Sequence, residues 1–385
     1  MKIQVSIPNN PLPVACSVMG DVMCYADNSN ARQRIRLIGE SLHGIIVVPP
    51  NGRNLVPPEA KGEVVEAPFR PKGIWQTLKL VRSYRGKVRA WHYPVSNEKT
   101  FLTSILLSLL SGVPIILGCW DPPGGTLWDR KGFVASIRRW VTICLMNVAI
   151  YFSKGLLLTH HPGFWKSKCT GKVFAKIHHF PNGTTCEKNR LVLEGVQKVA
   201  KRLVMACRVS ELKNCWYAAD FFIRLWQMDN EVSLVWIGGG LDREVFRYMV
   251  ERGVPADRLL MPGGIGRDEA IPYIATATYG LNLYPDTQNL KWNYLLKLPE
   301  FLSFGLPIIS NNLPGSLEYV REGVTGIVVQ CGNIKEATER TYELINDPIR
   351  TKQMSENAIR LAQQYAWHEI NDKMANCINY NMLLG

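Results

Sequence analysis

One stretch in the last third of the chain decides the fold class. It reads Lys297-Leu-Pro-Glu-Phe-Leu-Ser-Phe-Gly305-Leu-Pro-Ile-Ile-Ser310, followed by Asn311-Asn-Leu-Pro-Gly-Ser-Leu-Glu318. Lys297 and Glu300 are three residues apart on a predicted short helix, so both side chains point the same way. A glycine ends this helix, an apolar strand follows, and Glu318 is expected to begin the next helix. Helix, glycine turn and strand in this order are typical of an α/β sheet, which binds ligands at the strand ends.

The same alternation of strand and helix patterns continues along the 385 residues, which are enough for two domains. In the first half, apolar runs such as 114–119 alternate with helical patterns such as 133–152, and the second half repeats this rhythm from residue 202. We expect the first strand at 21–26, whereas 1–19 fits less well and is an extra strand or an arm. The pattern predicts parallel, doubly wound sheets.

The charge of the chain is distributed unevenly. The formal net charge is +13, and residues 131–184 contain eight Lys and Arg but no Asp or Glu. Such a concentration predicts an anionic partner, which is a membrane surface, a phosphorylated acceptor or nucleic acid. The alternative is a solvated basic surface without a partner. Nucleic acid fits least well, because the basic region lacks the interleaved aromatic residues of a known binding module.

Two apolar stretches, 105–120 and 140–152, raise the question of a membrane. The first is interrupted by Gly112 and Pro114, and the second has about 13 residues, fewer than a spanning helix needs. We expect both to be core, although Arg138-Arg139-Trp140 could lie on a bilayer. We expect no secretory leader, because Met1 and Lys2 are not followed by a long apolar run, and the ten cysteines lack metal-site spacing. We therefore expect a cytoplasmic protein, peripheral to the membrane, without a bound metal.

A second motif follows the first predicted strand of the second half: Ala206-Cys-Arg-Val-Ser-Glu-Leu-Lys213. Together with the opening stretch it resembles retaining glycosyltransferases of family 4, whose motifs include K-x-x-E-x-x-x-x-G-x-P and G-R-L-x-x-x-K-G. The resemblance covers about residues 114–370. It implies a GT-B fold, in which two Rossmann-like doubly wound domains face a central cleft. The domains would be an acceptor-binding domain (1–184), a nucleotide-sugar domain (185–366) and a terminal helix that returns to the first domain (367–385).

The resemblance also implies roles for residues of the nucleotide-sugar domain. Arg208 and Lys213 would hold the donor diphosphate, and Glu300 would bind the ribose hydroxyls. The first glutamate of the family pattern falls at Trp292 and is therefore absent, which leaves the contacts to the donor sugar open. The remaining residues that we assign to the donor site are Gly239, Gly263, Asn293, Lys297 and Leu298, with Asn289 and Lys291 as further polar candidates for the sugar.

The acceptor side is less well defined. The family carries a His-Asp pair at the end of the fifth strand, where this chain has Trp120-Asp121. Asp121 is the catalytic candidate, which would orient a hydroxyl group, or it simply caps the following glycines. Four further residues are acceptor-side candidates, each with a structural role as the alternative: Asn28, Asn30, His92 and His161.

These observations predict a retaining, metal-independent glycosyltransferase. It would move a sugar from a UDP- or GDP-sugar to a glycan or lipid-linked acceptor. We expect no cofactor besides the nucleotide-sugar, which is the donor substrate, and no nucleic-acid partner. The alternative is a catalytically silent GT-B scaffold or sugar-binding protein. The missing glutamate and histidine favour that alternative, whereas Arg208, Lys213, Lys297 and Glu300 oppose it.

Overall fold

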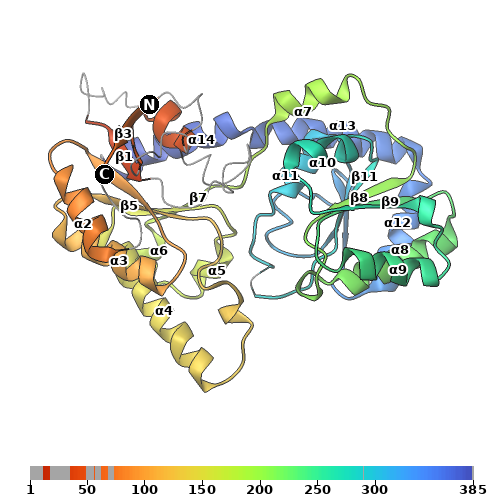
Figure 1. The fold of residues 1–385 in the computed structure, drawn as a ribbon, viewed down its shortest axis with the longest axis horizontal. Helices are drawn as coiled ribbons and strands as arrows, with labels where there is room; N and C mark the ends of the chain where they lie inside the picture. Colours follow the sequence, from red (N-terminus) through yellow and green to blue (C-terminus); the bar gives the residue numbers. More distant parts are fainter. Residues whose placement is uncertain are drawn as a thin grey trace. The chain divides into compact units, whose positions relative to one another are not determined.

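A computed structural model describes residues 12–17, 35–48, 56, 62–67, 73–288 and 290–383. The chain divides into two compact units, which Figure 1 shows as ribbons and which we describe separately. Unit 1 comprises residues 1–180 and 368–385, and unit 2 comprises residues 181–367. Both units are α/β.

The sheet of unit 1 is parallel throughout and has the order β3-β2-β1-β4-β5-β6-β7. One of its interior strands, β1, comes from the segment 1–19 that the sequence pattern left unplaced. The strand expected at 21–26 lies outside the described residues. The strands are β1 (Val14–Ser17), β2 (Ile45–Val48), β3 (Glu63–Glu66), β4 (Ala90–Pro94), β5 (Ile115–Cys119), β6 (Gly155–Leu158) and β7 (Ile177–His179).

Helices connect these strands. The start of α3 shows how the sequence determines a helix boundary: the Asn97 side chain accepts from the Thr100 amide at 3.1 Å, and the Thr100 hydroxyl accepts from the Asn97 amide at 3.0 Å. The helical segments of this part of the chain are η2 (Leu37–Ser41), α2 (Ile74–Ser83), α3 (Glu98–Leu110), η4 (Gly125–Trp128), α4 (Phe133–Phe152), α5 (Gly163–Lys166), α6 (Gly171–Phe174), α14 (Trp367–Asn376) and η8 (Cys377–Met382).

Helix α4 differs from its prediction in one respect. It has the expected bounds, but the expectation that 140–152 is core holds for one face of the helix only. Trp140, Tyr151 and Phe152 are exposed, and the buried positions of the helix lie on another face. The sequence could not show this, because a helix that is apolar all round has no periodicity from which to read its buried side.

The sheet of unit 2 is also parallel and has the order β10-β9-β8-β11-β12-β13. This is the strand order of a Rossmann fold, which reverses between β8 and β11. The strands are β8 (Arg202–Ala206), β9 (Ser233–Ile237), β10 (Leu259–Gly263), β11 (Tyr279–Asn282), β12 (Ile308–Asn311) and β13 (Gly326–Val329). The helical segments are α7 (Cys186–Leu193), η5 (Glu211–Lys213), α8 (Cys215–Met228), α9 (Asp242–Glu251), η6 (Ala256–Arg258), α10 (Arg267–Ala275), α11 (Lys297–Ser303), α12 (Ile334–Ile345), α13 (Pro348–Ala362) and η7 (Gln363–Tyr365).

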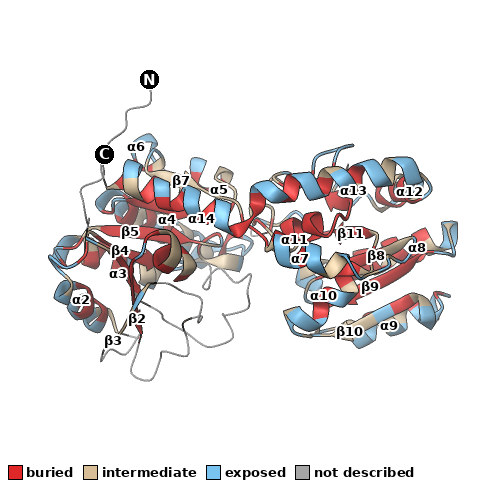
Figure 2. Cartoon of the chain, turned by 90° about the horizontal axis from the view of Figure 1, so that it is seen from above, coloured by how far each residue is buried: buried red, intermediate tan, exposed pale blue. Residues whose placement is uncertain are grey.

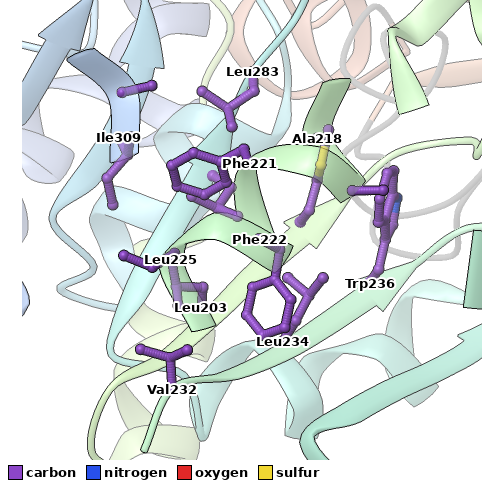
Figure 3. Packing of buried hydrophobic residues seen from close by; sticks show 14 of the residues in the cluster. Leu203, Ala218, Phe221, Phe222, Leu225, Val232, Leu234, Trp236, Leu283 and Ile309 are labelled. Atoms are coloured by element: carbon purple, nitrogen blue, oxygen red, sulfur yellow. The ribbon is translucent and has the colours of Figure 1, made fainter. Parts of the chain in front are cut away.

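The core of unit 2 fixes the strands that carry the functional loops. Phe221 and Phe222 of α8 are fully buried in one cluster with Trp236 of β9 (Figure 3). Figure 2 shows the strands of this sheet as mainly buried and the outer faces of α8 and α9 as exposed. Because protein interiors are close-packed, the ends of β8 and β9 are held in fixed positions.

Candidate functional site

The candidate site of unit 2 lies where its strand order reverses. In open α/β sheets, ligands bind outside the carboxyl ends of the strands at this point. Here the reversal lies between β8 and β11, which pair in parallel. The loops that follow these two strands and their neighbours contain most of the residues that the sequence assigned to the donor.

The two predicted phosphate-binding cations follow β8. Arg208 is exposed, two residues after the strand. Lys213 ends η5, and its Nζ lies 4.9 Å from the centroid of the Tyr284 ring, which follows β11. This cation–π contact holds a lysine at the reversal point. Both cations therefore belong to the edge where an anionic ligand is expected.

Glycine is required in the loop after β9. Gly238 and Gly240 have φ angles of +152° and +130°. A Cβ on Gly238 would lie 1.9 Å from the Cys207 carbonyl oxygen, and one on Gly240 would lie 2.2 Å from that of Val209. The two predicted donor glycines belong to this edge as well: Gly239 lies against Gly264, and Gly263, with φ at +78°, ends β10. Side chains are thus excluded where backbone approaches backbone closely.

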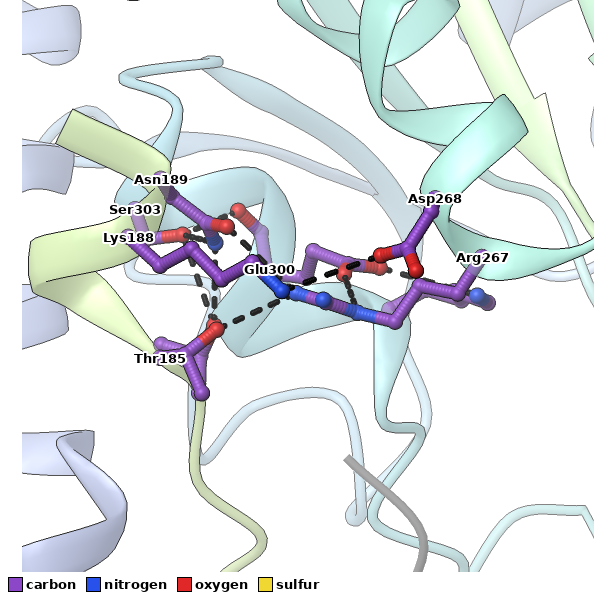
Figure 4. Close-up of polar contacts among 9 residues, drawn as sticks. Thr185, Lys188, Asn189, Arg267, Asp268, Glu300 and Ser303 are labelled. Atoms are coloured by element: carbon purple, nitrogen blue, oxygen red, sulfur yellow. Dashed lines mark hydrogen bonds and ion pairs between the residues drawn. The ribbon is translucent and has the colours of Figure 1, made fainter. Parts of the chain in front are cut away.

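Glu300 is at the centre of a buried polar cluster (Figure 4). Its side chain is 2% exposed, and its Oε1 accepts from Arg267 Nε at 3.0 Å. Lys297 Nζ lies 3.5 Å from Oε2. Arg267 is itself 10% exposed, and its Nη2 donates to Thr185 Oγ1 at 3.1 Å and to Asn189 Oδ1 at 3.4 Å. Two cations therefore face the two oxygens of one buried carboxylate.

Sequence reasoning missed Arg267. It lies 33 residues before Glu300 in the chain and begins α10 just after the glycine loop that ends β10. Its position in the sequence could have identified it, because the first residue of a helix that follows a parallel strand lies at the carboxyl edge of the sheet. No family pattern singled it out.

Asn293 and Leu298 lie in the segment before and within α11. The Asn293 carbonyl faces Gly315, where a Cβ would come within 2.2 Å of its oxygen, and the Gly315 amide donates to the Lys291 carbonyl at 2.8 Å. The Oδ1 atom of Asn293 is buried and has no hydrogen-bond partner among the described residues. The Leu298 side chain belongs to the core, so only its backbone remains available to a donor.

The prediction that Glu318 begins a helix is wrong. Residues 314–319 form turns. Glu318 instead faces Tyr365, whose hydroxyl donates to the Glu318 carbonyl at 2.8 Å and to its Oε1 at 3.1 Å. Next to it, Ser316 accepts from Asn282 Nδ2 at 2.9 Å, and Asn282 ends β11. These contacts anchor the turn to the sheet.

The candidates in unit 1 occupy different environments. Asp121 is exposed just after β5, and its carbonyl accepts from Cys119 Sγ at 3.2 Å. His92 lies within β4, has no exposed surface and packs where a side chain on Gly118 would otherwise lie. His161 Nδ1 accepts from the Gly163 amide at 3.1 Å, at the start of α5. Asn28 and Asn30 lie outside the described residues.

The neighbouring His160 is a buried, neutral imidazole. Its Nε2 accepts from Trp165 Nε1 at 2.7 Å, and burial, which penalises the charged form, lowers its pKa to about 3. Among the described residues, no three His, Cys, Asp or Glu side chains are grouped so as to hold a metal ion.

We expect acid to destabilise the protein through His160. An unfolded histidine has a pKa of about 6.5, so this group's contribution is complete above that pH and is lost as the pH falls towards about 3. The loss is about 1.4 kcal/mol per pH unit in this window, or about 2 kcal/mol between pH 6.5 and pH 5. Urea unfolding of the wild type and His160→Gln at pH 7 and pH 5 measures this. Equal pH dependence of the two proteins contradicts it.

The second half of the chain resembles known proteins in sequence. Residues 194–361 match the sequence model of the glycosyl transferases group 1 family. A GDP-mannose-dependent alpha-(1-6)-phosphatidylinositol monomannoside mannosyltransferase of Mycobacterium tuberculosis is 27% identical over 153 residues, which are 37% of this chain. The match spans only 38% of that relative's length.

Solved structures resemble nearly the whole chain. The Anabaena protein Alr3699/HepE, solved in complex with UDP, has a TM-score of 0.69 at 14% identity and covers 96% of this chain and 99% of its own. Sucrose-phosphate synthase from Thermosynechococcus elongatus has a TM-score of 0.69 at 15% identity, and the match covers 97% of this chain and 100% of the synthase. The galactosyltransferase WaaB of the lipopolysaccharide outer core has a TM-score of 0.66 at 12% identity. The match covers 96% of this chain and 100% of WaaB. At these identities the likeness shows a shared fold.

Proposed function

We propose that the chain transfers a sugar from a nucleotide-sugar donor to a glycan or lipid-linked acceptor, because residues 194–361 match the glycosyl transferases group 1 model and the chain has the GT-B fold. The observation that carries this proposal is the placement of Arg208 and Lys213 at the strand reversal of unit 2. Fixed cations at this position suit a diphosphate, because preorganised charges stabilise the anion that forms as the glycosidic bond breaks.

The donor is a UDP- or GDP-sugar. Support comes from the relatives, since one similar structure holds UDP and one similar enzyme is named for its dependence on GDP-mannose. Glu300 binds the ribose through Oε2, the oxygen that faces the partly exposed Lys297. Arg267 acts behind it and holds the carboxylate in its orientation through the hydrogen bond to Oε1. The reaction retains the configuration of the sugar, as the resemblance to family 4 implies, and needs no metal ion, because Arg208 and Lys213 supply the positive charge.

The acceptor is bound by unit 1, with Asp121 as the residue that orients its hydroxyl group. The excess of basic residues in this half of the chain supports an anionic acceptor or surface. The mycobacterial relative is named for a phosphatidylinositol monomannoside, which is a lipid. We therefore propose that the enzyme works at the cytoplasmic face of a membrane, as a peripheral protein, on a lipid-linked acceptor.

A panel of UDP-, GDP-, ADP- and dTDP-sugars tests the donor. At a ligand concentration of 100 times Kd, binding stabilises a protein by about 2.7 kcal/mol, which corresponds to a rise of about 5–10 °C in the Tm of a domain the size of unit 2. We expect a rise with the UDP or GDP compounds and the same donor hydrolysis with and without EDTA. A panel without any shift contradicts the donor assignment, and a loss of hydrolysis in EDTA contradicts metal independence.

A catalytically silent GT-B protein is the second candidate. It is favoured by Trp292 and Trp120, which occupy the positions of the family's first glutamate and histidine. The two candidates differ in one measurement. A silent protein binds the nucleotide sugar with a Tm shift but neither hydrolyses it nor transfers the sugar to any acceptor in a lipid extract.

A further inference from the structure

Helix α4 has two apolar faces. Successive residues of an α-helix are rotated by about 100°. On this wheel the buried residues Thr142, Met146, Ala149 and Ile150 share one side, which packs into unit 1. The exposed apolar side chains lie opposite, within an arc of about 120° that runs the length of the helix; they are Phe133, Val134, Ile137, Trp140, Val141, Val148, Tyr151 and Phe152.

The exposed face is large and includes an aromatic anchor. Phe133 is 80% exposed and Trp140 is 67% exposed. Exposed leucines of α3, which packs against α4, extend the apolar surface. Between the starts of the two helices lies a hollow of about 830 Å³, whose lining includes Glu98, Phe133, Val134 and Val141. Contiguous apolar surfaces of this kind mark interaction sites.

The surroundings of this face determine the kind of partner. The acidic residue that lines the hollow, Glu98, is paired with Arg138 at 2.7 Å, and this hydrogen bond lowers its pKa. Lys99 and Lys131 are exposed beside the face. No acidic residue occurs in 131–184, whereas eight basic residues do. The partner is therefore apolar at its centre and anionic at its rim.

We propose that α4 lies in the interfacial layer of a bilayer that contains anionic lipids, with Phe133, Ile137 and Trp140 inserted among the acyl chains. Within the described part of the chain, α4 is the helix long and apolar enough to cross a membrane. It lies flat instead, because its opposite face is packed into unit 1. Trp and flanking Lys or Arg are the residues that prefer this layer. The proposal deepens the membrane location stated above, on which it rests, by assigning the surface and the lipid class.

Vesicle co-sedimentation without nucleotide tests this. We expect binding to vesicles of phosphatidylcholine with phosphatidylglycerol, and much weaker binding to phosphatidylcholine alone or at high salt. Trp140→Ser should weaken binding about tenfold. Trp75→Ser is the matched control, because Trp75 is 66% exposed on α2 of the same unit, and it should bind as the wild type does. Phe133→Ser provides a second variant at the start of α4.

Depth measurements on the wild type keep the test independent of folding. Lipids brominated on the acyl chains should quench the fluorescence of the bound wild type more than that of bound Trp140→Phe. Equal quenching, or equal binding of Trp140→Ser and Trp75→Ser, overturns the proposal. So does a wild-type dimer that Trp140→Ser converts to a monomer without a change in vesicle binding, which would assign the face to a second copy. Donor binding, measured separately by calorimetry, reports on the proposed function alone.

Discussion

Replacing Arg208 by alanine should weaken nucleoside diphosphate binding by about 2–4 kcal/mol, or about 30- to 900-fold. Arg208 lies two residues after the strand at the reversal point of unit 2 and is exposed, so its guanidinium is available to a ligand. A diphosphate brings at least two negative charges to this edge. Loss of the arginine leaves them with Lys213, whose position is held by Tyr284.

Isothermal titration calorimetry with UDP and GDP measures this effect. Arg224→Ala is the matched control: it removes the same charge from an exposed arginine of α8, more than two turns from the start of that helix. The control should bind as the wild type does at moderate salt. Unchanged affinity of Arg208→Ala, or equal weakening in both variants, removes Arg208 from the donor site and leaves only a general charge effect.

Glu300→Gln should lower turnover at least about tenfold, because the amide keeps the shape of the side chain but loses the charge and half of its acceptor capacity.

The buried ion pair of Glu300 with Arg267 also contributes to stability, which can be measured separately from turnover. Arg267→Ala should lower the free energy of unfolding by about 3–5 kcal/mol, since it leaves the Glu300 carboxylate buried without its closest partner. Replacing both residues by methionine should restore most of this stability while turnover stays low.

Urea unfolding and initial rates on the same variants separate the two roles. Lys335→Ala is the stability control, because Lys335 and Glu339 form an exposed ion pair on α12 that should contribute little. Full turnover in folded Glu300→Gln would falsify the ribose role. An Arg267→Ala variant as stable as the wild type would show that Glu300 does not need Arg267 to remain buried.

Much of the architecture could be predicted from the chain. Alternating apolar strands and helical patterns predicted parallel α/β units, and the bounds of α4 and the start of the second sheet at residue 202 are those expected. The motif around Lys297 and Gly305 was readable for the same reason. Its residues act within one helix and the turn that follows, so their spacing along the sequence is also their spacing in space.

Other features depended on contacts between distant segments. The short run 14–17 has no helical or alternating signature, and it became an interior strand of the sheet only by pairing with both β2 and β4. Arg267 meets Glu300 because α10 and α11 both begin at the carboxyl edge of one sheet. The exposed face of α4 is the clearest case. The sequence of an apolar helix shows that the helix avoids water. Only the packing of unit 1 determines which side of α4 is buried, and the other side remains available to a partner.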